Sequence, residues 1–179
     1  MEKNISNQAM TGLLFTGGEG PPAARLDDVL LEPRRIVVAA DSGLEAALEA
    51  GVEPDLVVGD MDSLSDRALL GRVSRERVLE FPPDKDETDT EIGLRLLFER
   101  GATRVVLIGG GGGRLAHLMG ILQLFRRPTS PDLWLTARET VRPFEDSLTV
   151  EGRLGRTVSF FPLSDPVGVE SSYGLKWPL

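Results

Sequence analysis

The sequence predicts an α/β protein in which a parallel β-sheet wound with helices is followed by a small antiparallel β domain. Apolar runs typical of buried strands alternate with helical patterns up to residue 127, and such alternation favours a parallel sheet. Beyond the segment RRPTSPD the sequence becomes rich in β-forming residues and turns. We therefore expect two domains, residues 1–128 and residues 129–179, the second of them incomplete on its own.

The first part of the chain predicts three buried strands with helices between them. TGLLFTGGEGPP (11–22) predicts a short strand that runs into a glycine turn, and RRIVVAADSG (34–43) predicts a second strand. A compact helix follows in LEAALEAG (44–51), where the final glycine ends it. The run LVVGDMDSL (56–64) predicts a third strand, and a further helix is expected around residues 66–73.

The second part continues the alternation and then changes character. ERVLEFPP (76–83) predicts a strand closed by two prolines, and the segment 84–101 predicts a helix capped by Thr88 or Asp89. RVVLIGGGGGR (104–114) predicts another buried strand before a helix over residues 115–125. About four to six short antiparallel strands are expected after residue 132. This β unit is too small to close on itself, so we expect it to pair with another chain or to lack a part.

Composition and charge exclude several classes of function. The chain has 179 residues with 20 Lys and Arg against 28 Asp and Glu, a formal charge of −8 that disfavours general nucleic-acid binding. The absence of cysteine excludes disulfides, thiolate catalysis and Cys-ligated zinc, and a single histidine excludes a multi-His metal site. No apolar run of roughly 18 residues and no signal-peptide pattern is present, so we expect a cytoplasmic protein without membrane association.

Acidic residues follow the expected strand ends. Asp60 and Asp62 come just after the third strand, and two such charges about 4 Å apart repel by roughly 4 kcal/mol at an effective dielectric near 20. A hard divalent cation would compensate this repulsion, although a solvated acidic turn is the alternative. Asp41 follows the second strand in the same way, and the segment Asp84–Asp89 enters a helix beside them. Because ligands gather at the carboxyl ends of parallel strands, these acids together predict a site for a metal and a phosphate chain.

Five consecutive glycines, Gly109 to Gly113, separate the last buried strand from Arg114. Glycines let backbone N–H groups approach a phosphate, and the following helix N-terminus favours anions. A flexible turn is the alternative, because neither the P-loop pattern nor the G-x-G-x-x-G pattern is present.

Five short motifs lie in order along the chain. They are ADSG (40–43), GDMDS (59–63), PPDKDETD (82–89), GGGGR (110–114) followed by His117, and GLKWPL (174–179). Each motif is modest alone, but in this order they resemble the thiamine pyrophosphokinase family, and the likeness runs over nearly the whole chain.

The resemblance implies a three-layer, Rossmann-like catalytic domain, a C-terminal β-sandwich, and a homodimer through the β domain with active sites between subunits. It also implies a transferase, an ATP-dependent diphosphokinase of thiamine diphosphate biosynthesis. In the implied reaction a pyrophosphoryl group moves from ATP to the hydroxyl of thiamine, giving thiamine diphosphate and AMP. Mg²⁺ is the implied cofactor and ATP the co-substrate.

Carried over position by position, the resemblance assigns roles to particular residues. Asp60, Asp62 and Asp89 would hold Mg²⁺, and with Asp86 they are the implied catalytic residues. The general base stays open between Asp62 and Asp86, with His117 as a further option. The implied nucleotide contacts are Asp41, Ser42, Lys85, Thr88, Gly111, Gly112, Gly113 and Arg114. The implied contacts to thiamine are His117, Ser172 and Trp177.

Two positions on the acceptor side depart from the family pattern. Ala116 stands where the family has Asp, and Ile121 stands where a polar residue is common. The family also continues beyond its G-L-K-[WY]-x-L strand. Three alternatives therefore stay open: a related diphosphokinase for another alcohol, a catalytically silent ATP-binding protein, or an α/β domain whose acidic loops bind nothing.

Overall fold

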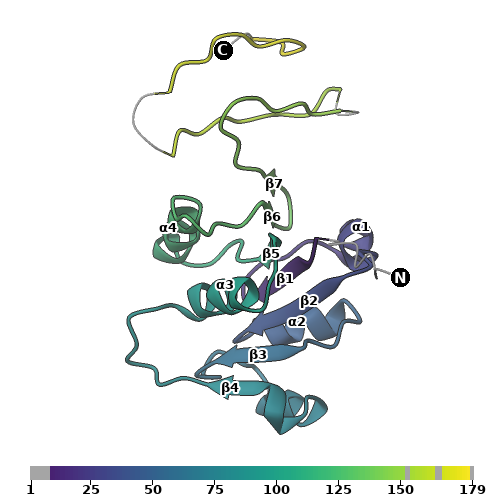
Figure 1. Ribbon diagram of the computed structural model, residues 1–179, viewed down its shortest axis with the longest axis vertical. Coiled ribbons are helices and arrows are strands. Elements are labelled where there is room, and N and C mark those ends of the chain that lie inside the picture. Colours follow the sequence, from purple (N-terminus) through teal and green to yellow (C-terminus); the bar gives the residue numbers. More distant parts are fainter. Residues whose placement is uncertain (1–8, 152–153, 164–166, 178–179) are drawn as a thin grey trace, which may run out of the picture. The chain divides into compact units, whose positions relative to one another are not determined.

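A seven-stranded sheet forms the centre of the first of two structural units. The computed structural model describes residues 9–151, 154–163 and 167–177, and the chain divides between Pro143 and Phe144. The strands lie in the order β4-β3-β2-β1-β5-β6-β7, as Figure 1 shows. All neighbouring strands are parallel except β6 and β7, which are antiparallel. The strands are β1 (Thr11–Thr16), β2 (Arg35–Ala40), β3 (Leu56–Gly59), β4 (Val78–Glu80), β5 (Arg104–Gly109), β6 (Leu133–Leu135) and β7 (Thr140–Val141).

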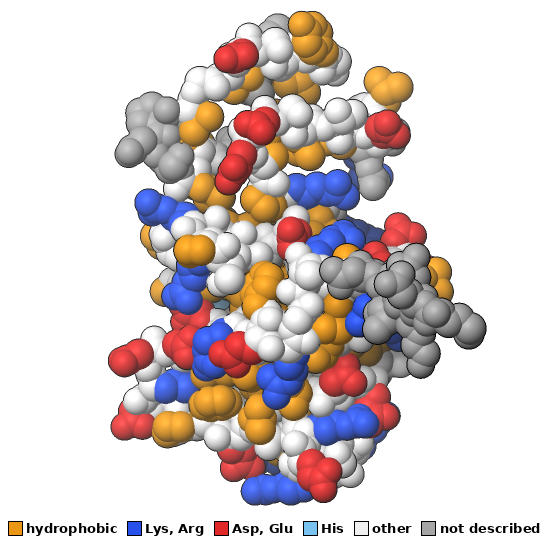
Figure 2. All heavy atoms as spheres, viewed as in Figure 1, with side chains coloured by type: hydrophobic (Ala, Val, Ile, Leu, Met, Phe, Trp, Pro, Cys, Tyr) orange, Lys and Arg blue, Asp and Glu red, His pale blue; other side chains and the backbone are white. Residues whose placement is uncertain are grey.

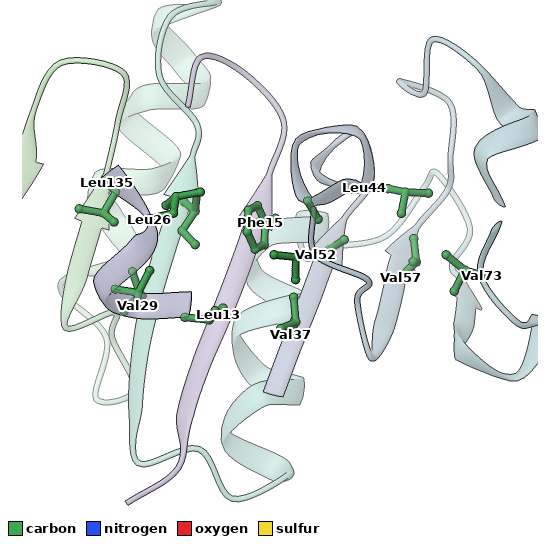
Figure 3. Packing of buried hydrophobic residues seen from close by; sticks show 14 of the residues in the cluster. Leu13, Phe15, Leu26, Val29, Val37, Leu44, Val52, Val57, Val73 and Leu135 are labelled. Carbon is green, nitrogen blue, oxygen red and sulfur yellow. The ribbon is translucent and has the colours of Figure 1, made fainter. Parts of the chain in front are cut away.

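Helices cover both faces of this sheet and make a three-layer α/β domain. Leu13 and Phe15 of β1 pack with Leu26, beside α1, and with Leu44 of α2 (Figure 3). Leu14 points to the other face, where it lies against Gly93 of α3. This alternation follows from the two-residue period of a strand. The helices are α1 (Asp27–Leu30), α2 (Gly43–Glu49), α3 (Asp89–Glu99) and α4 (Leu115–Leu124), with 3₁₀ helices at Ala23–Arg25, Arg67–Arg72 and Arg75–Arg77.

The fold class predicted from the sequence is confirmed, and the structure adds detail at two places. The helix expected around residues 66–73 is a 3₁₀ helix, whose N-cap Asp66 accepts a hydrogen bond from the backbone N–H of Ala68. α1 was not predicted, because four residues carry too little periodic signal.

None of the described helices is long and apolar enough to cross a membrane. Acidic and basic side chains are interspersed on the face drawn in Figure 2.

The sheet extends beyond residue 128, where the sequence placed the domain boundary. β6 pairs with the edge of β5, and Trp134 of β6 is buried and donates a 2.7 Å hydrogen bond to the carbonyl of Gly109. Arg25 donates hydrogen bonds to the carbonyls of Thr136 and Ala137 and so fixes the turn between β6 and β7. Residues 129–143 therefore belong to the sheet of the first unit rather than to a separate β domain.

The second unit has fewer regular elements than the sequence predicted. About four to six antiparallel strands were expected after residue 132, but no strand is assigned among the described residues after Val141. Phe144 and Phe160 pack edge to face with their ring centroids 6.3 Å apart, yet 47% of Phe144 and 41% of Phe160 remain exposed. Two paired strands are only marginally stable when no other residues pack over their apolar face. This explains why no strand pair is found among the described residues after Val141.

Candidate functional site

Three aspartates from different elements converge at the carboxyl edge of the sheet. Asp41 follows β2, Asp60 follows β3, and Asp89 is the first residue of α3. One carboxylate oxygen of each lies within 4.8 Å of the other two. The carboxyl ends of β2 and β3 are adjacent in the parallel sheet, so the strand order alone brings the first two acids together.

Backbone conformations at the strand ends make this convergence possible. Asp41 (φ 52°) and Met61 (φ 61°) are the non-glycine residues with positive φ in the described part of the chain; Asp41 belongs to the triad, and Met61 directly follows Asp60. Such conformations are costly and cluster at functional sites. Met61 is fully buried in the core and anchors its turn. Gly59 (φ 142°) leaves the space between Asp41 and Asp89, since a Cβ there would lie 3.2 Å from the side chains of both.

The first turn of α3 is fixed by two networks of hydrogen bonds. Thr88 and Glu91 form a capping box, in which each side chain accepts a hydrogen bond from the backbone N–H of the other. Arg127 forms an ion pair with the second oxygen of Glu91. On the inner side, the hydroxyls of Thr16 and Thr90 share a buried hydrogen bond of 2.7 Å. Asp89, which lies between these networks, is therefore held in place.

Lys85 supplies positive charge to the triad. Its ammonium lies 3.1 Å from Oδ1 of Asp89 and 3.8 Å from Oδ2 of Asp60, and only 14% of its side chain is exposed. Asp41 has no ion-pair partner among the described residues. Ser63 donates a hydrogen bond to Oδ2 of Asp41.

Two oxygens of the triad are buried without a hydrogen-bond donor aligned to them, Oδ1 of Asp41 and Oδ1 of Asp89. Lys85 contacts the latter oxygen only as an ion pair. Buried polar atoms of native proteins nearly always have partners, so Oδ1 of Asp41, which has neither a donor nor an ion pair, indicates room for a partner such as a cation.

The charge states of the triad follow from this arrangement. Burial raises the pKa of Asp41 above its ordinary value, and nearby Asp89, Asp60 and Asp62 raise it further against the hydrogen bond from Ser63. Burial likewise raises the pKa of Asp89, although Lys85 opposes the shift. The backbone N–H of Asp62, which donates a 3.0 Å hydrogen bond to Asp60, lowers the pKa of Asp60. Two of the three carboxylates therefore carry an energetic cost when ionised without a cation.

The predicted acidic residues separate into two groups. Asp60 and Asp89 lie in the triad, whereas Asp62 and Asp86 are exposed and outside it. Asp62 is still close enough for its charge to act on Asp41 and Asp89. The resemblance assigned Asp41 to the nucleotide, and the structure places its carboxylate beside those of Asp60 and Asp89. Its position after a strand in the ADSG motif was the available signal.

The glycine turn after β5 meets the turn after β1. Glu19 and Gly111 form an isolated antiparallel bridge, with hydrogen bonds of 2.7 and 3.0 Å in the two directions. Gly112 lies against the side chain of Glu19, and Gly113 is exposed. Ser42, half-buried, lies below this region, 3.3 Å from the hydroxyl of Ser63. The glycine turn, for which a flexible turn was one alternative, is thus bound to a neighbouring loop by backbone hydrogen bonds.

A pocket of about 300 Å³ opens beside the first turn of α3. Thr88 and Thr90 line it from α3, and Arg114 and His117 line it from the start of α4. The remaining wall is mostly apolar and consists of Ala116, Gly120, Ile121 and Leu124. Ser172 and Trp177 lie in the second unit, where 74% of Trp177 is exposed.

Comparisons with known proteins agree with the geometry. A family model described as "Thiamin pyrophosphokinase, catalytic domain" matches residues 28–136. The thiamine pyrophosphokinase of Bacillus subtilis (strain 168) is 24% identical over 155 residues, which cover 79% of this chain and 69% of that protein.

Solved structures show the same likeness. Thiamin pyrophosphokinase from Geobacillus thermodenitrificans is 30% identical with a TM-score of 0.53, and the match covers 71% of this chain and 59% of that one. The crystal structure of the Bacillus subtilis protein, at 21% identity and a TM-score of 0.57, shares the fold over 71% of this chain and 60% of that one. The matched part therefore spans about three fifths of these solved chains.

Proposed function

The chain belongs to the thiamin pyrophosphokinase family, and on this premise we propose that it transfers the pyrophosphoryl group of ATP to the hydroxyl of thiamine. The acceptor hydroxyl loses its proton to a base and its oxygen bonds to the β-phosphorus, while the bond from that phosphorus to the oxygen shared with the α-phosphate breaks, so the products are thiamine diphosphate and AMP. The observation that carries the proposal is the shared first turn of α3. Asp89 of this turn belongs to the carboxylate triad, and its neighbours Thr88 and Thr90 line the pocket.

The triad has the chemistry of a magnesium site. Mg²⁺ prefers carboxylate oxygens at about 2.0–2.1 Å, so two ligands on opposite sides lie about 4.2 Å apart. The oxygens of Asp41, Asp60 and Asp89 lie within 4.8 Å of one another, and a shared Mg²⁺ would draw them closer together. Oδ1 of Asp41, which has no hydrogen-bond partner, and Oδ1 of Asp89, which Lys85 contacts, would supply two of the ligands. Bound there, the cation would neutralise phosphate charge, and we assign Asp62 to the edge of the same site.

One cationic side chain lies at the triad and another lines the pocket. Lys85 is at the triad, and Arg114 at the pocket can hold a phosphate with two parallel hydrogen bonds. A primary alcohol is a weak nucleophile, so alignment with the β-phosphorus and stabilisation of the developing charge provide the catalysis. Asp86, Ser42 and the turn Gly111–Gly113 remain our candidates for further contacts to the nucleotide.

The acceptor side of the pocket is apolar where Ala116 and Ile121 form its wall. We assign His117, Ser172 and Trp177 to thiamine and expect a homodimer through the C-terminal region. The apolar wall also favours a second candidate, a related diphosphokinase whose acceptor alcohol carries a less polar ring.

One assay distinguishes these possibilities. The protein is incubated with ATP, Mg²⁺ and thiamine, and AMP and thiamine diphosphate are quantified by chromatography. Equal amounts of both products are expected. AMP formation with other alcohols but not with thiamine would support the second candidate. Binding of ATP by calorimetry without product from any acceptor would contradict both and indicate a silent nucleotide-binding protein.

A further inference from the structure

Lys85 occupies an unusual place for a lysine. Most lysines are exposed unless paired, yet only 14% of this side chain is accessible. Its ammonium lies 3.1 Å from Asp89 and 3.8 Å from Asp60, and it donates a 3.2 Å hydrogen bond to the carbonyl of Pro82. No other described lysine or arginine forms an ion pair with the triad.

The two carboxylates that hold this ammonium belong to the triad that fits a divalent cation. One face of the triad is therefore already neutralised, whereas Asp41 is left without a cation and with a raised pKa. A divalent cation between the three carboxylates would lie within a few ångströms of the present ammonium position. Like charges so close repel strongly in a partly buried site, so the two cations exclude each other.

We propose that Lys85 is a displaceable counter-cation: its ammonium neutralises Asp60 and Asp89 in the metal-free protein, and an entering divalent cation drives it out of the triad. The proposal rests on the proposed function, because it uses the same metal site. By competing for the same carboxylates, Lys85 controls the affinity of the site for the metal.

The local structure permits this movement. Lys85 lies in the segment 81–88, which contains no helix or strand, and its flexible four-carbon stem can move the charge without moving the backbone. A released ammonium needs a new anionic partner, and the phosphate chain of a nucleotide provides one. The metal should therefore bind weakly alone and more tightly together with the nucleotide, because the phosphate chain of the nucleotide draws the Lys85 ammonium away from the carboxylates.

The first experiment measures the accessibility of Lys85 directly. The wild-type protein is pulsed with an amine-acetylating reagent at constant ionic strength, with MgCl₂ or with NaCl, and peptides are quantified by mass spectrometry. Lys176 is the internal reference, because its ammonium lies over Trp177 in the second unit, outside the triad. Acetylation of Lys85 is expected to rise several-fold with Mg²⁺, whereas that of Lys176 stays constant.

The second experiment compares Lys85→Met with the matched control Lys176→Met. Calorimetric titration with Mg²⁺ alone is expected to show binding to Lys85→Met at least about fivefold tighter than to the wild type, the lower end of usual coupling between two ligands. Lys176→Met is expected to bind like the wild type. Thermal unfolding without metal should show a lower midpoint for Lys85→Met, and saturating Mg²⁺ should restore it.

The outcomes separate this proposal from the one on which it rests. Tighter binding without a change in acetylation would mean that Lys85 acts only at a distance, and displacement would be wrong. Unchanged affinity and unchanged acetylation, with Mg²⁺ bound, would overturn the proposal and leave the metal site intact. Absence of Mg²⁺ binding by all three proteins would overturn both the proposal and the metal site.

Discussion

Thr16, the last residue of β1, shares a buried 2.7 Å hydrogen bond with Thr90 in the first turn of α3. This bond joins the central strand of the sheet to the helix that carries Asp89. It also lies at the wall of the pocket, which Thr90 lines. The pair therefore connects the core, the triad and the pocket through two hydroxyl groups.

Replacing either threonine by valine should destabilise the protein more than replacing both. Each single change leaves one buried hydroxyl unpaired, which costs about 1–3 kcal/mol, whereas the double change leaves none. The measurement is the free energy of unfolding in urea for Thr16→Val, Thr90→Val and the double variant. Thr103→Val is the control, since its hydroxyl is exposed and should cost little. Additive losses in the double variant would show that the hydroxyls are not coupled.

Asp41→Asn should stabilise the metal-free protein at neutral pH. The folded-state pKa of Asp41 is raised above its ordinary value of 3.8, chiefly by burial, so the folded state binds a proton more readily than the unfolded state. The stability from this proton is complete below that ordinary value and is lost as the pH rises through the folded pKa. An amide oxygen can still accept the hydrogen bond from Ser63.

Thermal unfolding without metal at neutral pH and near pH 4 checks this prediction. The variant should unfold at a higher temperature than the wild type at neutral pH, and the difference should shrink at the lower pH. Mg²⁺ should stabilise the wild type more than the variant. A variant that is less stable than the wild type at neutral pH would contradict the cost assigned to the ionised carboxylate.

Gly59→Ala should disrupt the triad. A methyl group there would lie 3.2 Å from the side chains of Asp41 and Asp89, and the φ of 142° is unfavourable for alanine. We expect a loss of stability of about 2 kcal/mol or more, from backbone strain and crowding together. Gly51→Ala is the matched control, because Gly51 also has positive φ but no atom within 4 Å of the added carbon. Equal losses in both variants would mean that crowding plays no part.

Glu91 should matter more than its partner Arg127. Glu91→Ala removes the capping-box bond to the N–H of Thr88 and also the ion pair with Arg127. Losing such a cap costs about 0.5–2 kcal/mol, while an exposed ion pair contributes at most about 1 kcal/mol. Arg127→Met should therefore be the milder change in a urea unfolding series. Mg²⁺ affinity should fall in Glu91→Ala, because Asp89 lies in the same turn. Equal destabilisation by both substitutions would mean that the cap contributes little.

The sequence carried enough information for the strands and for part of the triad. Runs such as Val105–Ile108 are apolar at every position, which is typical of a strand covered on both faces, and the structure buries them. The acids after such runs were expected at one edge with Asp89 beside them, and Asp41, Asp60 and Asp89 do meet there. A parallel sheet places every carboxyl end on the same edge, so this step needs no knowledge of side-chain direction.

Asp41 and Asp62 were both expected at this edge, but which of the two lies closest to Asp60 and Asp89 could not be predicted. It depends on the left-handed backbone at Asp41 and Met61, and neither residue signals that conformation in the way that a glycine does. The extension of the sheet by β6 and β7 was also missed. The three residues of β6 carry little periodic signal. The hydrogen bond from Arg25 to the carbonyl of Thr136, which holds the turn after β6, joins segments far apart in the sequence.

The first strand of the chain is the middle strand of the sheet. Thr11 of β1 pairs with Arg35 on one side and with Arg104 on the other. During synthesis the apolar β1 is thus produced early, but its second edge stays open until residues 104–109 have left the ribosome. Pairings between such distant segments slow folding, since the entropy of closing a long loop is lost before any contact compensates for it. The second edge of β1 is therefore paired only when β5 docks, and we expect this docking to be a late step in folding.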